Sequence, residues 1–258
     1  MGGQDNVRVL GDVVSNPLAS PQVQKYAAMS LNSIADPSSG PALLRALHTI
    51  SWPEAAEQTA ETLGRIRYEI AAPEVLSRMK SEPHEARQQV YYARALASLR
   101  YKPAVPAIEQ LCKTTKFSGD WALKEQQDEY LGWVPEIALM RLTASWGPPS
   151  DGIRLLLLPS ENPAMHGQIR VVAVVENVGD RDLDILGAPG GDVIVDGTRY
   201  HRDSVITDGS ITLRVNDVAV HAIDLSGLIA EGGPHRVEYQ LGTANSNQLT
   251  VEIPPVKR

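Results

Sequence analysis

The first half of the chain repeats one pattern of small and apolar positions. Within each copy these positions are spaced i, i+3 and i+6, which places them on one face of an α-helix. A proline follows each copy in the same register, and proline suits the first turn of a second helix. The columns step by 32 and then 33 residues: Ala28, Ala60 and Ala93; Leu31, Leu63 and Leu96; Ile34, Ile66 and Leu99; Pro41, Pro73 and Pro106. The pattern predicts two-helix units, which bury their apolar faces only when they stack.

Incomplete copies are predicted at both ends of this array. Leu139 and Leu142 continue two of the columns after a step of 43 rather than 33 residues. The extra residues lie in "KTTKFSGDWALKEQQDEYLGW", which we interpret as a loop and a lengthened first helix. At the front, "NVRVLGDVVSN" predicts a lone second helix that caps the end of the stack.

These units resemble HEAT repeats, specifically the short bacterial kind similar to the HEAT-like repeats of phycobilisome lyases. The columns above and the downstream "P-x-[LIV]" pattern carry the resemblance, which covers about residues 5 to 147. It implies an α-α solenoid, a fold class used mostly as a curved platform for other proteins.

The composition changes after "TASWGPPSDG". All four Trp and the only Phe, Phe117, lie before residue 147, and residues 151 to 256 contain no Lys. We therefore predict two domains, a repeat solenoid over 1–147 and a second domain over 148–258. The prolines of "GPPS" restrict the backbone, so a short, stiff join is expected.

The second domain shows the period-two pattern of β-strands. "HRVEYQL" alternates apolar and polar residues, as a half-buried strand does, and "IRVVAVVEN" is apolar on both faces, as a covered central strand is. Asp196-Gly197 predicts a hairpin turn, and Asn216-Asp217 predicts a second, weaker one. Eight or nine short strands at this spacing predict an antiparallel β-sandwich.

Two segments of this domain resemble the immunoglobulin-like modules of bacterial surface proteins, including the adhesion-type CARDB group. The segments are "VVAVVENVGDRDLDIL", in which a strand runs into Glu-Asn-x-Gly, and "GGPHRVEYQL". The resemblance covers about 100 residues and implies an Ig-like sandwich, although the Cys and Trp pattern of true immunoglobulin domains is missing.

The charge balance of the chain disfavours some classes of function. The chain carries 24 basic and 31 acidic residues, net −7, whereas sequence-independent nucleic-acid binding needs a basic surplus. Residues 151–258 hold 9 basic and 15 acidic residues, so the sandwich is the acidic half. Tyr200 and Tyr239 are its only aromatic residues, which disfavours carbohydrate stacking. We expect a protein partner and no nucleic acid.

The sequence contains few residues that are candidates for catalysis. HEAT-like hydroxylases such as deoxyhypusine hydroxylase hold two irons with His-Glu pairs from several repeats, but this chain has one such pair, His84-Glu85, and its neighbouring copy has Ser51-Trp52. No motif identifies a pigment pocket like that of a bilin lyase. We predict no catalytic residue, no cofactor and no metal site, with a HEAT-like enzyme as the alternative.

Two further candidates have structural explanations. Cys112 shares its repeat column with Leu47 and Met79, which indicates a core position rather than a nucleophile. Aspartates near "RYHRD", including Asp192, Asp196 and Asp203, suit turns and leave a structural Ca²⁺ as an open alternative.

One column predicts a binding surface. His48, Lys80 and Lys113 recur near the ends of successive second helices, where stacking would align them into a basic ladder. If the second helices line the concave side, an acidic segment of a partner could lie along it. The competing explanation is that cations near a helix C-terminus are favoured by its dipole. The sequence therefore predicts a non-catalytic protein-binding or scaffolding module.

The compartment stays open. No window approaches the roughly 18 consecutive apolar residues of a membrane span, and "MGGQDNVRVL" lacks the features of a signal peptide. A soluble protein is expected. The alternative is a fragment of a secreted or envelope surface protein, periplasmic or extracellular if a signal peptide has been removed.

Overall fold

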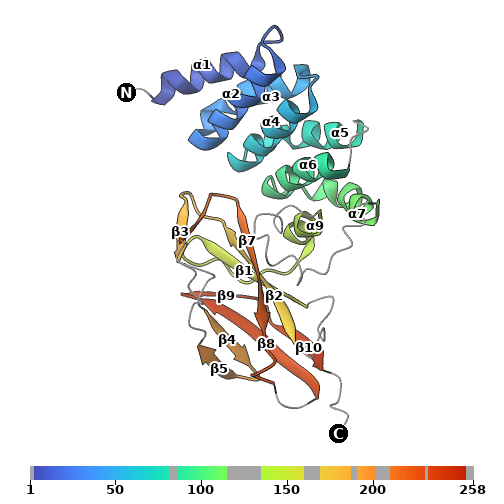
Figure 1. Cartoon of the computed structure of the whole chain (residues 1–258), viewed down its shortest axis with the longest axis vertical. Helices are drawn as coiled ribbons and strands as arrows, with labels where there is room; N and C mark the ends of the chain where they lie inside the picture. Colours follow the sequence, from blue (N-terminus) through green and yellow to red (C-terminus); the bar gives the residue numbers. More distant parts are fainter. Residues whose placement is uncertain are drawn as a thin grey trace. The chain divides into compact units, whose positions relative to one another are not determined.

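The computed structural model describes residues 3–81, 86–114, 135–159, 169–186, 191–201, 210–229 and 232–253. These residues form two compact units, the first reaching Thr143 and the second beginning at Ala144. The first is built of helices and the second of strands (Figure 1). Helical repeats followed by antiparallel sheets confirm the predicted fold class.

Eight α-helices lie in the described part of the first unit, and short 3₁₀ turns precede three of them. They are α1 (Gly3–Ser15), α2 (Pro21–Ile34), α3 (Gly40–Thr49), α4 (Pro53–Arg65), α5 (Ala72–Ser81), α6 (Ala86–Ser98), α7 (Val105–Thr114) and α9 (Pro135–Thr143), with η1 (Pro37–Ser39), η2 (Glu69–Ala71) and η3 (Lys102–Ala104). Pro41, Pro73 and Pro106 are each the second residue of α3, α5 and α7, as the repeat predicted.

Each complete unit turns from its first to its second helix in the same way. One of the two residues that follow the first helix adopts a left-handed backbone conformation. These residues are Ala35, Arg67 and Arg100, with φ of 55°, 53° and 54°. A 3₁₀ turn and then the second helix follow. Left-handed residues at this place end helices by satisfying their last carbonyl groups, and Tyr101 N–H, for instance, donates to Leu96 O at 3.0 Å. The predicted two-helix unit is thus confirmed.

The helices form two rows. In the first row α4 packs along both α2 and α6, and α9 packs along α6. In the second row, α3 and α5 touch far less. Small residues bring the first row together, because a Cβ on Gly64 would lie only 2.9 Å from Ala95 Cα. A curved stack is most crowded on its inner side, so α2, α4 and α6 form the concave side of this unit.

The repeat columns supply the core of the helical unit. Ala28, Ala60 and Ala93 and also Leu31, Leu63 and Leu96 are fully buried. In the third column Ile66 and Leu99 are buried, whereas Ile34 is 44% exposed. Its predicted place in the core is therefore wrong, since no earlier first-row helix precedes α2 among the described residues.

Both predicted end copies contain helices. Leu139 is half-buried and Leu142 is buried on α9, which lies in the first row as the fourth copy requires. The predicted loop and lengthened helix before it fall on residues 115–134, outside the described part. At the front, α1 packs on α2 and α3. A cap has a polar outer face, but α1 exposes Val9 and the following turn exposes Leu18.

Ten strands lie in the described part of the second unit. They are β1 (Ile153–Pro159), β2 (Arg170–Asn177), β3 (Leu183–Leu186), β4 (Asp192–Val195), β5 (Thr198–His201), β6 (Ser210–Leu213), β7 (Val218–Asp224), β8 (Gly233–Leu241), β9 (Ala244–Asn245) and β10 (Leu249–Ile253). They form antiparallel sheets of order β1-β2-β7, β10-β8-β4-β5 with β9 beside β8, and β3-β6.

The two larger sheets share one apolar core. Leu155 and Val171 from one sheet and Val193, Val237 and Tyr239 from the other are buried together. The segment "IRVVAVVEN" is the middle strand β2, and "HRVEYQL" is the half-buried strand β8, as predicted. Shared burial between sheets fits a sandwich, and its Ig-like type stays a prediction.

One predicted hairpin is confirmed and one is wrong. Asp196-Gly197 joins β4 to β5, with φ of 50° and 84°, the positive values that a two-residue hairpin turn needs. A turn also forms at Asn216-Asp217, but β6 pairs with β3 and β7 pairs with β2. The chain therefore passes from one sheet to another at this turn.

Residues just before the predicted boundary at 147 contact the second unit. Gly147 N–H donates to Leu155 O at 3.0 Å, and the Arg154 guanidinium lies 4.2 Å from the centre of the Trp146 ring. These contacts explain why the second unit begins at Ala144.

Candidate functional site

The predicted basic residues lie in the last turns of the second-row helices. Each is the second-last residue of its helix, His48 in α3, Lys80 in α5 and Lys113 in α7, and all three side chains are exposed. The second row is the widely spaced one, so the prediction that these helices line the concave side is wrong. The three residues lie on the outer row instead.

The structure does not align His48 with the two lysines. His48 Nδ1 lies 3.4 Å from Glu74 Oε1, near the start of α5. Six residues separate Glu74 from Lys80, which is about 9 Å along a helix axis. Arg78 also contacts Glu74 and donates a hydrogen bond to Leu47 O, so this junction is an internal ion-pair network. His48 therefore belongs to the packing of α3 on α5.

Lys80 and Lys113 differ from His48 in their ion pairing. Neither ammonium group lies within ion-pair distance of a carboxylate in the described part of the chain. Both occupy the same position of successive repeats. Within the described ranges, they are the part of the predicted ladder that forms no ion pair.

Cys112 and His84-Glu85 add no catalytic group. The Cys112 side chain is half-buried against the helical core, and its burial, reinforced by the charge of Glu136, raises the pKa of the thiol to about 11. A thiol with this pKa is protonated at neutral pH, which supports the predicted structural role. His84-Glu85 lies outside the described residues.

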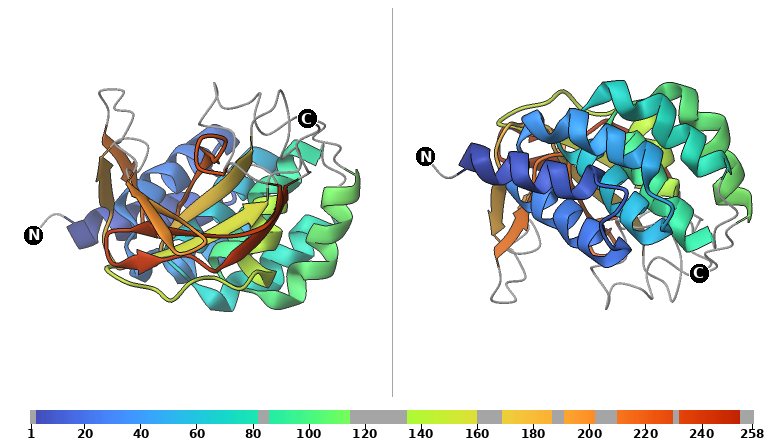
Figure 2. Two further views of the ribbon diagram at one scale, coloured as in Figure 1. Left: turned by 90° about the horizontal axis from the view of Figure 1, so that it is seen from below. Right: turned by 90° about the horizontal axis from the view of Figure 1, so that it is seen from above.

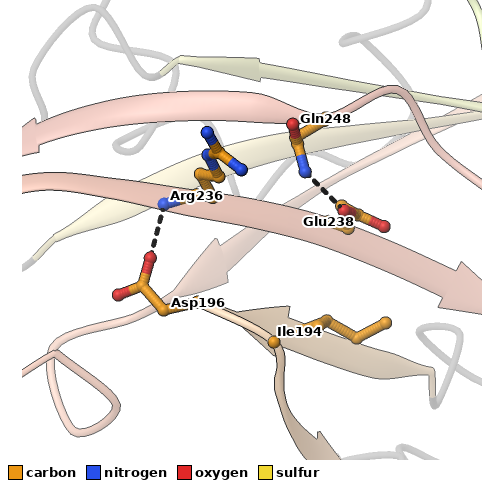
Figure 3. A pocket seen from close by; sticks show the side chains of 6 residues that line it. Ile194, Asp196, Arg236, Glu238 and Gln248 are labelled. Carbon is orange, nitrogen blue, oxygen red and sulfur yellow. Dashed lines mark hydrogen bonds between the residues drawn. The ribbon is translucent and has the colours of Figure 1, made fainter.

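A pocket lies on the outer face of the larger sheet (Figure 3). It has a volume of about 400 Å³, and its lining residues are Ile194, Asp196, Gly197, Arg236, Glu238 and Gln248. The close-up shows that two lining carboxylates accept hydrogen bonds: the Arg236 backbone N–H donates to Asp196 Oδ1 at 2.8 Å, and Gln248 Nε2 donates to Glu238 Oε1 at 2.8 Å. The pocket is open, polar and mixed in charge, which gives it no marked chemical preference.

Two aspartates near the predicted turns pair with basic side chains. Asp192 contacts His201 Nδ1 at 2.7 Å and Arg199 Nη1 at 2.9 Å, and the histidine bond first, then the arginine charge, lower the pKa of this carboxyl. Asp196 accepts a hydrogen bond from Arg236 N–H and contacts His235 Nδ1 at 2.7 Å. The bond from Arg236 first, and then the bond from His235, lower the pKa of the Asp196 carboxyl. Asp203 lies outside the described residues. Among those described, no three His, Cys, Asp or Glu residues converge as metal ligands would.

The sequence reasoning missed an exposed apolar surface at the start of the helical unit. Seven large apolar side chains are exposed in the described part of the chain, and six of them lie between residues 9 and 34. They are Val9, Leu18, Val23, Tyr26, Met29 and Ile34. Concentrations of this kind mark contact surfaces for other macromolecules. The spacing of Val23, Tyr26 and Met29 on one helix was the available signal.

The fold and its surfaces define a helical repeat protein with a second, β-sheet unit. Consistent with this class, the family model of HEAT repeats matches residues 9–93. No curated protein matches the chain.

The solved structures that resemble this chain include two proteins of low sequence identity. Human deoxyhypusine hydroxylase in complex with glycerol is 15% identical over 57% of this chain and 49% of its own, with a TM-score of 0.37, so this chain spans about half of it. The Pseudomonas fluorescens alkylpurine DNA glycosylase AlkC, bound to DNA containing an abasic site analogue, is 12% identical over 96% of this chain and 81% of its own, with a TM-score of 0.25. Neither likeness is close enough to indicate an activity or a ligand.

In the ranges that the structure describes, every helix is too short or too polar to cross a bilayer.

Proposed function

We propose that this chain is a non-catalytic binding module whose helical unit docks an acidic segment of a partner protein. The observation that carries the proposal is the pair Lys80 and Lys113, two exposed cations at the same position of successive repeats, with no ion-pair partner among the described residues. HEAT repeats match much of this unit, and stacked repeats present extended surfaces of this kind.

The dimensions of the pair set the form of the partner. Packed helices lie about 8–10 Å apart, and α5 and α7 belong to the wider row, so the two ammonium groups span at least that distance. An extended chain advances about 3.3 Å per residue, so the partner needs two carboxylates three or more residues apart. Nucleic acid is disfavoured as the partner, because the chain is acidic overall, at net −7.

The expected affinity from the two lysines is small. Each exposed ion pair contributes roughly 0.2–1 kcal/mol, so the pair accounts for at most about 2 kcal/mol of binding and is weakened by salt. Further contacts of the partner with the helices must supply the rest. Reversing both charges removes this attraction and adds repulsion, so it is expected to reduce binding by a factor on the order of 30, which about 2 kcal/mol represents.

Affinity capture from cell extract tests the proposal with three baits: the intact chain, the double variant Lys80→Glu/Lys113→Glu, and the single variant Lys102→Glu. Lys102 is another exposed lysine, at the start of η3, which leads into the opposite end of α7. Quantitative mass spectrometry is expected to find a protein with an acidic segment on the intact and Lys102→Glu baits but not on the double variant. Equal retention by all three baits would refute the assignment of this surface.

A further inference from the structure

The second-row helices α3, α5 and α7 have equivalent orientations in the repeat. Leu43, Val75 and Ile108 are equivalent residues of these helices, and all three are fully buried. Burial of the same position fixes the rotation of each helix about its axis, so equivalent side chains point in equivalent directions. In the first row, α4 packs along α2 and along α6 to a similar extent. The junction of α3 with α5 is therefore a template for the junction of α5 with α7, and Figure 2 shows these helices following one another in colour order from blue to green.

At the α3–α5 junction one carboxylate serves two basic side chains. Glu74 Oε1 lies 3.4 Å from His48 Nδ1, near the end of α3, and 3.7 Å from Arg78 Nε, one turn later on α5. Arg78 also donates a hydrogen bond to Leu47 O of α3. This carboxylate therefore joins the end of one second-row helix to the start of the next.

The α5–α7 junction keeps the basic residue of this arrangement and lacks its carboxylate. The residues equivalent to His48 and Glu74 are Lys80 and Ala107. Ala107 is half-buried against the helical core, and the first turn of α7 carries no acidic residue. Lys80 has no ion-pair partner among the described residues. The chain thus provides a lysine at this junction without the counter-charge that the template provides.

The α5–α7 junction also leaves more room than its template. Ala107 has only a methyl group where Glu74 has a side chain long enough to reach the preceding helix. Helices α5 and α7 touch each other less than α3 and α5 do. A side chain of another molecule therefore has more room beside Lys80 than it would have beside His48.

We propose that a carboxylate of the partner binds the Lys80 ammonium beside Ala107, in the place that Glu74 occupies beside His48. The inference rests on the proposed function and adds a binding mode to it, in which the partner completes a contact that the repeat makes internally one unit earlier. Asp or Glu fits this place, because the template group is a carboxylate. Ala107 keeps the place available and so determines whether the partner or the chain itself neutralises Lys80.

Thermal unfolding of the chain alone tests the geometry. Ala107→Glu supplies the missing carboxylate from α7, and this carboxylate is expected to pair with Lys80. The effect of Ala107→Glu on the melting temperature is therefore expected to be more favourable in the native chain than in a Lys80→Ala background, by about 1–3 °C, the range that one exposed ion pair gives in a unit of this size. Ala107→Gln, which has the same shape without the charge, is expected to act equally in both backgrounds. Equal effects of Ala107→Glu in both backgrounds would overturn the inference.

NMR titration with an oligo-aspartate peptide tests the binding, since it detects weak contacts. In the native chain the peptide is expected to shift the backbone signals of Lys80 and Ala107. Ala107→Glu is expected to weaken this binding about fivefold, as the loss of one exposed ion pair at its upper value would, and Ala107→Gln is expected to change it by less than about twofold. Ser38→Glu adds the same charge on η1, which packs on α1 and α3, and is expected to bind like the native chain.

The outcomes separate this inference from the proposed function. A native chain that does not bind the peptide, or binding that Ala107→Glu leaves unchanged, would overturn the carboxylate place beside Ala107, while capture of a partner through Lys80 and Lys113 would still stand. Weaker peptide binding by Ala107→Glu, together with its coupling to Lys80 in the melting temperatures, would support the inference. A chain that shows both effects but captures no protein would refute the proposed function alone.

Discussion

Asn177, in the Glu-Asn-x-Gly segment at the end of β2, provides a sharp test of how the second unit is held together. The residue is completely buried, and its side chain makes three hydrogen bonds. Its Nδ2 donates to Arg181 O and to Leu213 O, both at 2.9 Å, and its Oδ1 accepts from Gly179 N–H at 2.9 Å. One side chain thus ties the end of β2 to the turn after it and to β6.

We predict that Asn177→Ala destabilises the second unit by about 3 kcal/mol, because each lost hydrogen bond costs about 1 kcal/mol and leaves a partner without its bond. That is a large share of the roughly 5–15 kcal/mol that stabilises a domain. Asn245→Ala is the matched control, since Asn245 is exposed and its side chain makes no hydrogen bond among the described residues. The control is expected to change stability by no more than about 0.5 kcal/mol.

Urea unfolding read by hydrogen–deuterium exchange of individual peptides separates the second unit from the helices. The expected result is a lower urea midpoint for peptides of β2 and β6 in Asn177→Ala and an unchanged midpoint in Asn245→Ala. A loss below about 1 kcal/mol in Asn177→Ala, or an equal loss in both variants, would contradict the assigned role of this network.

Three further predictions follow from local geometry. Arg100→Gly is expected to stabilise the helical unit by about 1 kcal/mol, because φ of 54° strains any side chain, and an unchanged melting temperature would contradict this. Alkylation of Cys112 by iodoacetamide is expected to be slow at neutral pH and to keep rising toward the thiol pKa of about 11, whereas a plateau near pH 9 would count against its burial. A backbone N–H donor lowers the pKa of Asp196 below its unfolded value of about 3.9, so this carboxylate stabilises the fold at neutral pH and loses that effect as pH falls through the folded pKa. Asp196→Asn is therefore expected to lower the melting temperature at pH 7 and to match the native chain near pH 2; equal melting temperatures at both pH values would refute it.

The helical architecture could be predicted from the sequence because the same helical pattern recurs in several copies. Ala60 and Leu63 are buried, as are Ala93 and Leu96 at the equivalent positions of the next copy. Agreement between copies therefore indicates which residues are buried before the tertiary structure is known. The second unit offers no such redundancy. Its strands could be placed one at a time from their alternation, but the partner of β6 depends on which sheet edge is free, and that is a property of the whole unit.

The predicted ladder failed in part for a related reason. The column of His48, Lys80 and Lys113 assumes that successive second helices lie in register, whereas α3 ends opposite Glu74 near the beginning of α5. The axial offset between stacked helices depends on how the first-row helices pack. It cannot be predicted from the spacing of the repeats in the sequence. The lysines could be selected from the sequence, but their lack of an ion pair could not.

The exposure of Ile34 shows most clearly what a repeat column cannot predict. Ile34 belongs to the same column as Ile66 and Leu99, and nothing in its own repeat distinguishes it from those buried residues. Its exposure follows from its place at the end of the row, where the helix that covers Ile66 and Leu99 has no counterpart among the described residues. Burial inferred from a repeat column therefore holds only where neighbouring helices pack on the residue's own helix, as they do for Ile66 and Leu99.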